Sequence, residues 1–111
     1  MLNLSNNMLE SLPPEIGELE NLEELHLQKN NLKTLPDEIG ALKNLKKLFL
    51  DDNQFNSLPQ GIGSLINLEE LNLDNNMLTQ LPEEIGGLKK LKKLFLINNR
   101  LIELPENIGQ L

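Results

Sequence analysis

The sequence contains no cysteine, tryptophan or tyrosine, and its 111 residues include one histidine and three phenylalanines. A chain without cysteine can form neither a disulfide framework nor a thiolate zinc site, which fits a reducing compartment. The N-terminal residues lack the basic and apolar regions of a signal peptide, and no apolar run approaches the ~20 residues of a transmembrane helix. We therefore expect a cytoplasmic protein without a membrane span.

Basic residues are also scarce, since 10 lysines and arginines stand against 17 aspartates and glutamates, for a formal net charge of -7. This excess of negative charge argues against nucleic acid and anionic membranes as partners. The same excess favours a protein partner with a basic surface.

Groups suited to catalysis are few as well. His26 is the only histidine, no serine has a general base fixed near it in sequence, and residues 61–63 lack the lysine of a phosphate-binding loop. The acidic segment from Asp51 to Asn56 lacks both the ligand order and the glycine of an EF-hand. We expect no enzymatic activity, no cofactor and no metal site.

What the sequence does contain is a period of 23 residues without an insertion or deletion. Leucine, asparagine, Leu-Pro and Ile-Gly each recur at fixed offsets within the period. One leucine column comprises Leu2, Leu25, Leu48, Leu71 and Leu94, and the asparagine column comprises Asn7, Asn30, Asn53, Asn76 and Asn99. This self-similarity predicts one domain over residues 1–111, with nearly five units that stack to share a core.

Each unit follows the pattern LxxLxLxxNxLxxLPxxIGxLxx. Over its whole length the chain resembles the leucine-rich repeat family, and in particular the 23-residue class found in leptospiral and other bacterial proteins. Intracellular scaffolds that bind Ras-like GTPases are similar. The resemblance implies an α/β-type solenoid, a right-handed horseshoe with a parallel sheet of about five short strands on its concave face. It also implies a convex side of loops, 3-10 helix and polyproline II segments, and a role in protein–protein interaction.

The residues of the repeat support this fold independently. An LxL segment is a short strand whose two leucines point to the same face. The asparagine that follows can satisfy backbone groups that no neighbouring strand reaches, so the asparagine column predicts a ladder along the solenoid. Proline then blocks strand pairing, and Ile-Gly supplies an apolar anchor and a permissive turn.

Neither end of the chain departs from the internal pattern, so we see no N- or C-terminal cap in the sequence. Solenoids normally end in repeats with a polar outer face. One interpretation is that the chain is a segment of a longer repeat receptor or effector. The alternative is self-association through the uncapped ends, which would give a dimer or a head-to-tail array.

Charged residues alternate in sign from repeat to repeat just before each strand leucine. The column nearest the strand comprises Glu24, Lys47, Glu70 and Lys93, and the preceding column comprises Glu23, Lys46, Glu69 and Lys92. Neighbouring strands would therefore carry opposite charges. Because exposed ion pairs contribute only about 0–1 kcal/mol, we interpret these columns as a solvated ladder.

The segment KKLFL occurs twice and places a phenylalanine between two strand leucines, at Phe49 and Phe95. Because alternate strand residues point to opposite faces, both phenylalanines should stand on the outer face, in water. An exposed aromatic side chain on a concave surface is typical of a binding hot spot. Duplication of a 46-residue doublet would also produce the pair.

The column two residues further on contains two adjacent carboxylates, Asp51 and Asp74, followed by Ile97. Like charges on neighbouring strands repel, and a basic side chain of a partner would relieve the repulsion. The residues predicted to contact a protein partner are therefore His26, Phe49, Asp51, Asn72, Asp74, Phe95 and Ile97.

Overall fold

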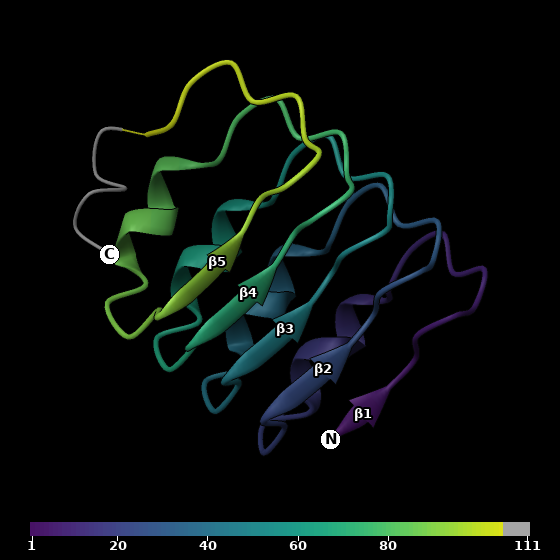
Figure 1. Ribbon diagram of the computed structural model, residues 1–111. Coiled ribbons are helices and arrows are strands. Elements are labelled where there is room, and N and C mark those ends of the chain that lie inside the picture. The colour runs from purple at the N-terminus through teal and green to yellow at the C-terminus, as the bar shows by residue number, and fades with distance from the viewer. Residues whose placement is uncertain (106–111) are drawn as a thin grey trace.

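The computed structural model describes residues 1–105, and these residues form a solenoid of successive strand-and-helix coils (Figure 1). Along residues 1–105, five strands alternate with four 3-10 helices. The elements are β1 (Leu2–Asn3), η1 (Pro14–Glu18), β2 (Glu24–His26), η2 (Asp37–Ala41), β3 (Lys47–Phe49), η3 (Gln60–Ser64), β4 (Glu70–Asn72), η4 (Glu83–Gly87) and β5 (Lys93–Phe95). The last copies of the Ile-Gly pair, Ile108 and Gly109, lie outside the described residues.

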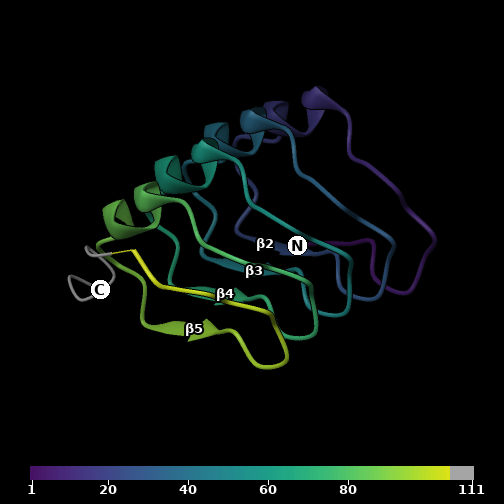
Figure 2. The same ribbon diagram turned by 90° about the horizontal axis from the view of Figure 1, so that it is seen from above.

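All five strands belong to one parallel sheet in the order β1-β2-β3-β4-β5. Each strand pairs with the next at an offset of one repeat, so that Leu25 lies beside Leu48 and Leu48 beside Leu71. The sheet lines one side of the solenoid and the 3-10 helices line the other (Figure 2). The predicted solenoid, with a parallel sheet on one side and 3-10 helices on the other, is confirmed.

The core lies between the sheet and the helices and consists of the repeated leucines and isoleucines. Leu25, Leu48, Leu71 and the isoleucine of η2, Ile39, are each fully buried. Proline precedes the helices η2, η3 and η4 in an extended conformation, with φ between -72° and -67°. Proline thus ends strand-like pairing and directs the chain into each helix.

The glycines of the Ile-Gly pairs have a different role from the predicted permissive turn. No glycine among the described residues has a positive φ, so the left-handed region is not what these positions require. A Cβ atom on Gly40 would lie 2.5 Å from the backbone oxygen of Gly61, and one on Gly63 would lie 2.5 Å from that of Glu84. Glycine is required because consecutive 3-10 helices approach each other closely.

Candidate functional site

The sheet brings four of the predicted contact residues into one row across its outer face. His26 lies beside Phe49, Phe49 beside Asn72, and Asn72 beside Phe95 in the strand register. The row therefore crosses four strands, β2 to β5, at one level of the concave surface. Adjacent members of the row are separated by the strand spacing of about 4.8 Å.

The two phenylalanines of this row are half-buried, which differs from the exposure to water that the sequence suggested. Alternation does direct both side chains away from the leucine core. Leu48 and Leu50 beside Phe49 are fully buried, and Leu94 and Leu96 beside Phe95 are partly buried and pack against the core. At the strand spacing, however, side chains on the outer face also contact and cover one another. The third phenylalanine, Phe55, belongs to the core and is fully buried.

His26 covers one side of Phe49. The two ring centroids lie 4.6 Å apart and the ring planes differ by 19°, so the rings stack. His26 Nε2 also lies 3.2 Å from Glu24 Oε1 on the same strand. The sequence placed these columns side by side, but it contained no signal for the orientation of the rings.

The second predicted row, which contains Asp51, Asp74 and Ile97, has an internal hydrogen-bond network. The backbone N–H of Asp74 donates to Asn72 Oδ1 at 3.0 Å, and the backbone N–H of Ile97 donates to Asp74 Oδ1 at 2.7 Å. Asn72 and Asp74 therefore have structural partners of their own. Ile97 is 64% exposed and extends the apolar surface beyond Phe95.

The carboxylate of Asp51 has hydrogen-bond partners for only part of its acceptor capacity. Its Oδ1 atom is buried without a hydrogen-bond partner, and so is Oε1 of Gln28, the residue one repeat earlier in the same column. Burial raises the pKa of the Asp51 carboxyl above its ordinary value of 3.8, and the charges of Asp52 and Asp74 raise it further. Its own backbone hydrogen bond and Lys29 offset part of this increase. Sequence reasoning did not identify Gln28, although its column position beside Asp51 was visible.

The asparagine column forms a hydrogen-bonded ladder beside this surface. Asn53 Nδ2 donates to the backbone oxygens of Leu27 and Leu50 at 3.0 and 3.1 Å, and its Oδ1 accepts from the backbone N–H of Leu32 at 3.0 Å. The same arrangement is formed by Asn30 and Asn76, while Asn99 is partly buried and Asn7 is exposed. The ladder holds adjacent strand ends in register and positions the two outer rows.

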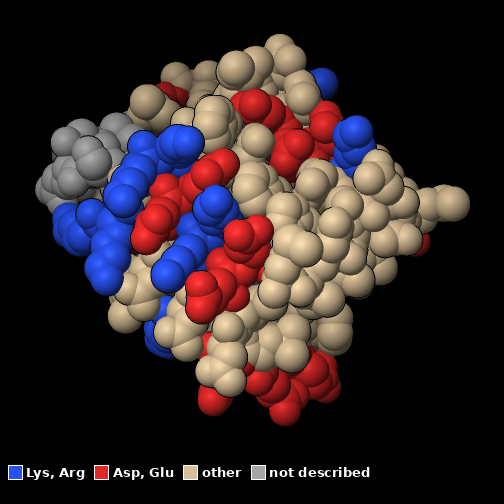
Figure 3. Space-filling view, turned by 60° about the horizontal axis from the view of Figure 1, so that its bottom comes forward, with Lys and Arg blue, Asp and Glu red and all other residues tan. Residues whose placement is uncertain are grey.

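The charged columns lie where the strands begin, and stripes of opposite sign alternate there (Figure 3). Lys46 Nζ lies 3.6 Å from Glu23 Oε1, and Lys92 Nζ lies 3.9 Å from Glu69 Oε1. All four side chains are substantially exposed. These pairs accordingly add little to stability.

Within residues 1–105, no cluster of three or more histidines, aspartates and glutamates is arranged to hold a metal ion. None of the helices in that part of the chain is long and apolar enough to cross a membrane.

Comparison with known families gives two matches. The model of the leucine-rich repeat region matches residues 1–77, and the model of the single leucine-rich repeat matches residues 67–88 and 90–111. No curated protein is significantly similar to the chain.

Two solved structures are similar to the chain in both sequence and fold. A leucine-rich repeat protein of Leptospira interrogans is 44% identical, with a TM-score of 0.75 over 98% of this chain and 34% of that protein. The leucine-rich repeat ectodomain of the plant membrane receptor kinase GASSHO1/SCHENGEN3 from Arabidopsis thaliana is 41% identical, with a TM-score of 0.80. That match covers 96% of this chain and 13% of the ectodomain. The chain thus spans about a third of the leptospiral protein and about an eighth of the plant ectodomain.

Proposed function

This chain belongs to the leucine-rich repeat family, and we propose that it is a non-catalytic module that binds a protein partner on its concave sheet. Leucine-rich repeats are generally protein-interaction modules. The observation that carries the proposal is the presence of three apolar side chains in the two outer rows of the sheet. Phe49, Phe95 and Ile97 stand there, outside the leucine core.

A polar residue at any of these three positions would leave the packing of the core unchanged, because the side chains point away from the core. Partly exposed aromatic side chains near the centre of a surface are the usual anchors of protein interfaces. Asp51 and Asp74 in the next row would receive a basic group, while His26 and Asn72 complete the contact surface. The curvature of a repeat solenoid presents such rows to a partner as one extended surface.

A related complex supports a binding role. The plant ectodomain that is similar to this chain was solved in complex with CASPARIAN STRIP INTEGRITY FACTOR 2. The identity of the partner of this chain is left to experiment, because fold alone does not choose among partners.

The direct test is affinity capture from the native cell with the double variant Phe49→Ser/Phe95→Ser. We expect the double variant to fold normally and to lose the captured partner, because it removes two anchors without touching the core. Ile66→Ser is the matched control, since Ile66 is also an exposed apolar residue, 54% accessible, but lies outside the two rows. Equal capture by the double variant and the control would reject the concave sheet as the binding surface.

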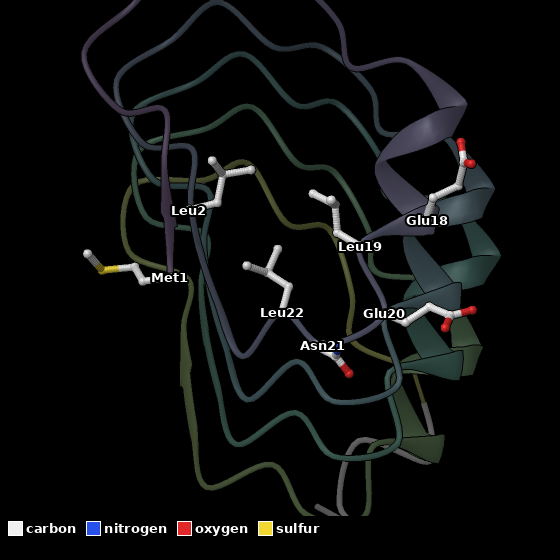
Figure 4. Close-up of a pocket in the computed structure, with 7 residues that line it drawn as sticks. All are labelled: Met1, Leu2, Glu18, Leu19, Glu20, Asn21 and Leu22. Carbon is white, nitrogen blue, oxygen red and sulfur yellow. The ribbon is translucent and has the colours of Figure 1, made fainter.

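A second candidate function rests on the face of the first repeat. A hollow of about 460 Å³ opens there and is lined by Met1, Leu2, Leu19, Leu22 and polar neighbours. Leu2, Leu19 and Leu22 point into the hollow, whereas Met1 points away from it (Figure 4). This exposed apolar space favours packing against a further repeat, either of a second copy or of a longer chain.

Light scattering over a range of protein concentrations tests self-association through this face. The second candidate predicts a mass that rises with concentration and falls back to the monomer in Leu19→Glu, which puts a charge in the hollow. A strict monomer at high concentration would exclude stacking between copies through this face.

A further inference from the structure

Four strands begin with a pair of like charges, and the sign alternates from one strand to the next (Figure 3). Each pair consists of the first residue of a strand and the residue before it, and we name the four pairs the charged stripes. The stripes comprise Glu23 and Glu24, Lys46 and Lys47, Glu69 and Glu70, and Lys92 and Lys93. With four glutamates and four lysines, this surface is locally neutral, although the whole chain has a net charge of -7.

Half of the stripe residues have no charged partner within the sheet. The residues before the strands form the two ion pairs described above. The first residues of the strands behave differently, although Lys47 lies beside Glu70 and Glu70 beside Lys93 in the strand register. Within residues 1–105, none of these three side chains forms an ion pair. Their charges are therefore available to a second molecule.

A hollow of about 240 Å³ opens over the glutamate stripe of β4. It is lined by Lys47, Glu69, Glu70, Lys92 and Lys93. The three lysines are exposed and the two glutamates are partly exposed. Because β4 lies between β3 and β5, the glutamates occupy the middle of the hollow and lysines flank them on both sides. The complementary surface has lysine in the middle and glutamate on both sides.

The chain itself carries that complementary surface, because the stripes of β2, β3 and β4 are glutamate, lysine and glutamate. A two-fold axis that runs parallel to the strands, between β3 and β4, sets the order β2-β3-β4-β5 of one copy against β5-β4-β3-β2 of another. Every glutamate stripe then faces a lysine stripe, and Lys47 of each copy faces Glu70 of the other. An axis perpendicular to the strands would keep the order and set like charges against each other.

We propose that a second copy of this chain docks on the charged stripes, with its repeats in the opposite order, to form a two-fold dimer. Such an interface uses the same patch on both copies, and its opposite charges fix the register. Exposed ion pairs contribute little, and the net charges of the two copies repel. We therefore expect a weak dimer, with a Kd on the order of 0.1–1 mM in about 0.01 M salt. The dimer goes beyond the proposed function, since it requires no other partner.

Sedimentation equilibrium of the 111-residue chain tests the dimer in about 0.01 M and about 1 M salt. We expect a dimer in the dilute salt and a monomer in the concentrated salt, where the Debye length falls to about 3 Å. Stacking through the apolar hollow of the first repeat would instead persist in concentrated salt, because it does not depend on charge. A strict monomer in dilute salt, or a dimer that is unaffected by salt, would overturn the proposal.

Charge reversals test the facing pair of Lys47 and Glu70. Lys47→Glu and Glu70→Lys each set like charges against each other and should weaken the dimer by at least about tenfold. The double variant Lys47→Glu/Glu70→Lys restores opposite charges at the native net charge, so it should dimerise as the native chain does. Lys33→Glu is the matched control, since Lys33 is an exposed lysine outside the stripes and its reversal should weaken the dimer much less.

Two outcomes of the charge reversals would reject the facing pair. Equal weakening by Lys47→Glu and Lys33→Glu would show that association depends only on net charge. A double variant that dimerises no better than the single variants would show that the two residues do not face each other.

The order of the repeats is tested with a spin label. Because the sequence contains no cysteine, Asn21→Cys provides a single attachment site, in the exposed turn before β2. The labelled chain is mixed with isotope-labelled native chain in dilute salt. We expect the label to broaden the NMR signals of Lys92 and Lys93 in the other copy. Broadening at Glu23 and Glu24 instead would mean that the stripes align in the same order, and would reject the proposed dimer.

Discussion

At the scale of the residue, five positions in the described part of the chain hold a left-handed backbone, one in each repeat. Asn6, Asn75 and Asn98 occupy three of them, and Lys29 and Asp52 occupy the others, with φ between 58° and 60°. The backbone N–H of Lys29 donates to the oxygen of Asp51 there, at 3.0 Å, so the conformation extends the pairing beyond the regular strand. Asparagine tolerates this region better than lysine or aspartate does.

Lys29→Asn should therefore stabilise the protein relative to Lys29→Gln by about 0.5–1 kcal/mol, because both remove the same charge and only asparagine favours the left-handed region. Urea unfolding of the two variants, monitored by circular dichroism, measures the difference. A glutamine variant as stable as the asparagine variant would show that the left-handed backbone carries no such cost here.

Asp51 gives a pH-dependent prediction. Its pKa is raised in the folded protein by burial and by the charges of Asp52 and Asp74, whereas in the unfolded chain it is close to 3.8. Below pH 3.8 the carboxyl is protonated in both the folded and the unfolded state, so it does not lower the free energy of unfolding. As the pH rises through the folded pKa, the carboxylate forms on the partly buried surface and stability is lost.

Asp51→Asn should accordingly be more stable than the native protein near pH 7, by less than about 1 kcal/mol because the group remains partly solvated. The advantage should shrink as the pH falls toward 3.8. Thermal unfolding of both proteins across this range tests the sign. An advantage that stays constant with pH would mean that the substitution acts through packing and not through charge.

At the scale of the element, the strands and the asparagine ladder followed from the sequence because each depends on a local pattern. The LxL segments alternate, and asparagine recurs where each strand ends. The stack of His26 on Phe49 and the hydrogen bond from Ile97 to Asp74 could not be predicted, because they depend on side-chain orientations across strands. The glycine of the Ile-Gly pair suggests a turn in the sequence. Its real constraint is the short distance between two consecutive 3-10 helices, which a sequence pattern does not reveal.

Two glycines of the 3-10 helices allow a matched test of whether the close approach of consecutive helices requires glycine. A Cβ atom on Gly40 would meet the backbone oxygen of Gly61 at 2.5 Å. Among residues 1–105, the nearest atom to a Cβ on Gly87 would be the backbone oxygen of Gly63, 3.5 Å away. Gly40→Ala should destabilise the protein by about 1–3 kcal/mol through overpacking. Gly87→Ala should be neutral or stabilise it by up to about 1 kcal/mol.

Denaturant unfolding of both variants checks this comparison, with the slope of each transition confirming that the same surface is exposed. If both alanine variants are equally stable, the close approach of η2 and η3 is not needed for the stacking of repeats.

At the scale of the whole molecule, the repeat that builds the core also decides where function can lie. The leucines of β2, β3 and β4 are buried in the core, so the variable positions between them form the outer rows of the sheet. The sequence sufficed to predict these rows, because a constant period of 23 residues keeps every column aligned. Which molecule binds them depends on the chemistry of Phe49, Phe95 and the adjacent carboxylates, and not on the fold.

The central claim is that a protein partner docks on the concave sheet and not on the helical side. Photo-crosslinking in the native cell tests it most directly, with a benzophenone amino acid at Asn72 between the two phenylalanines or at Glu38 on η2, an exposed helical position. The account predicts a crosslinked protein from position 72 and none from position 38. A crosslink that forms from position 38 alone would contradict it.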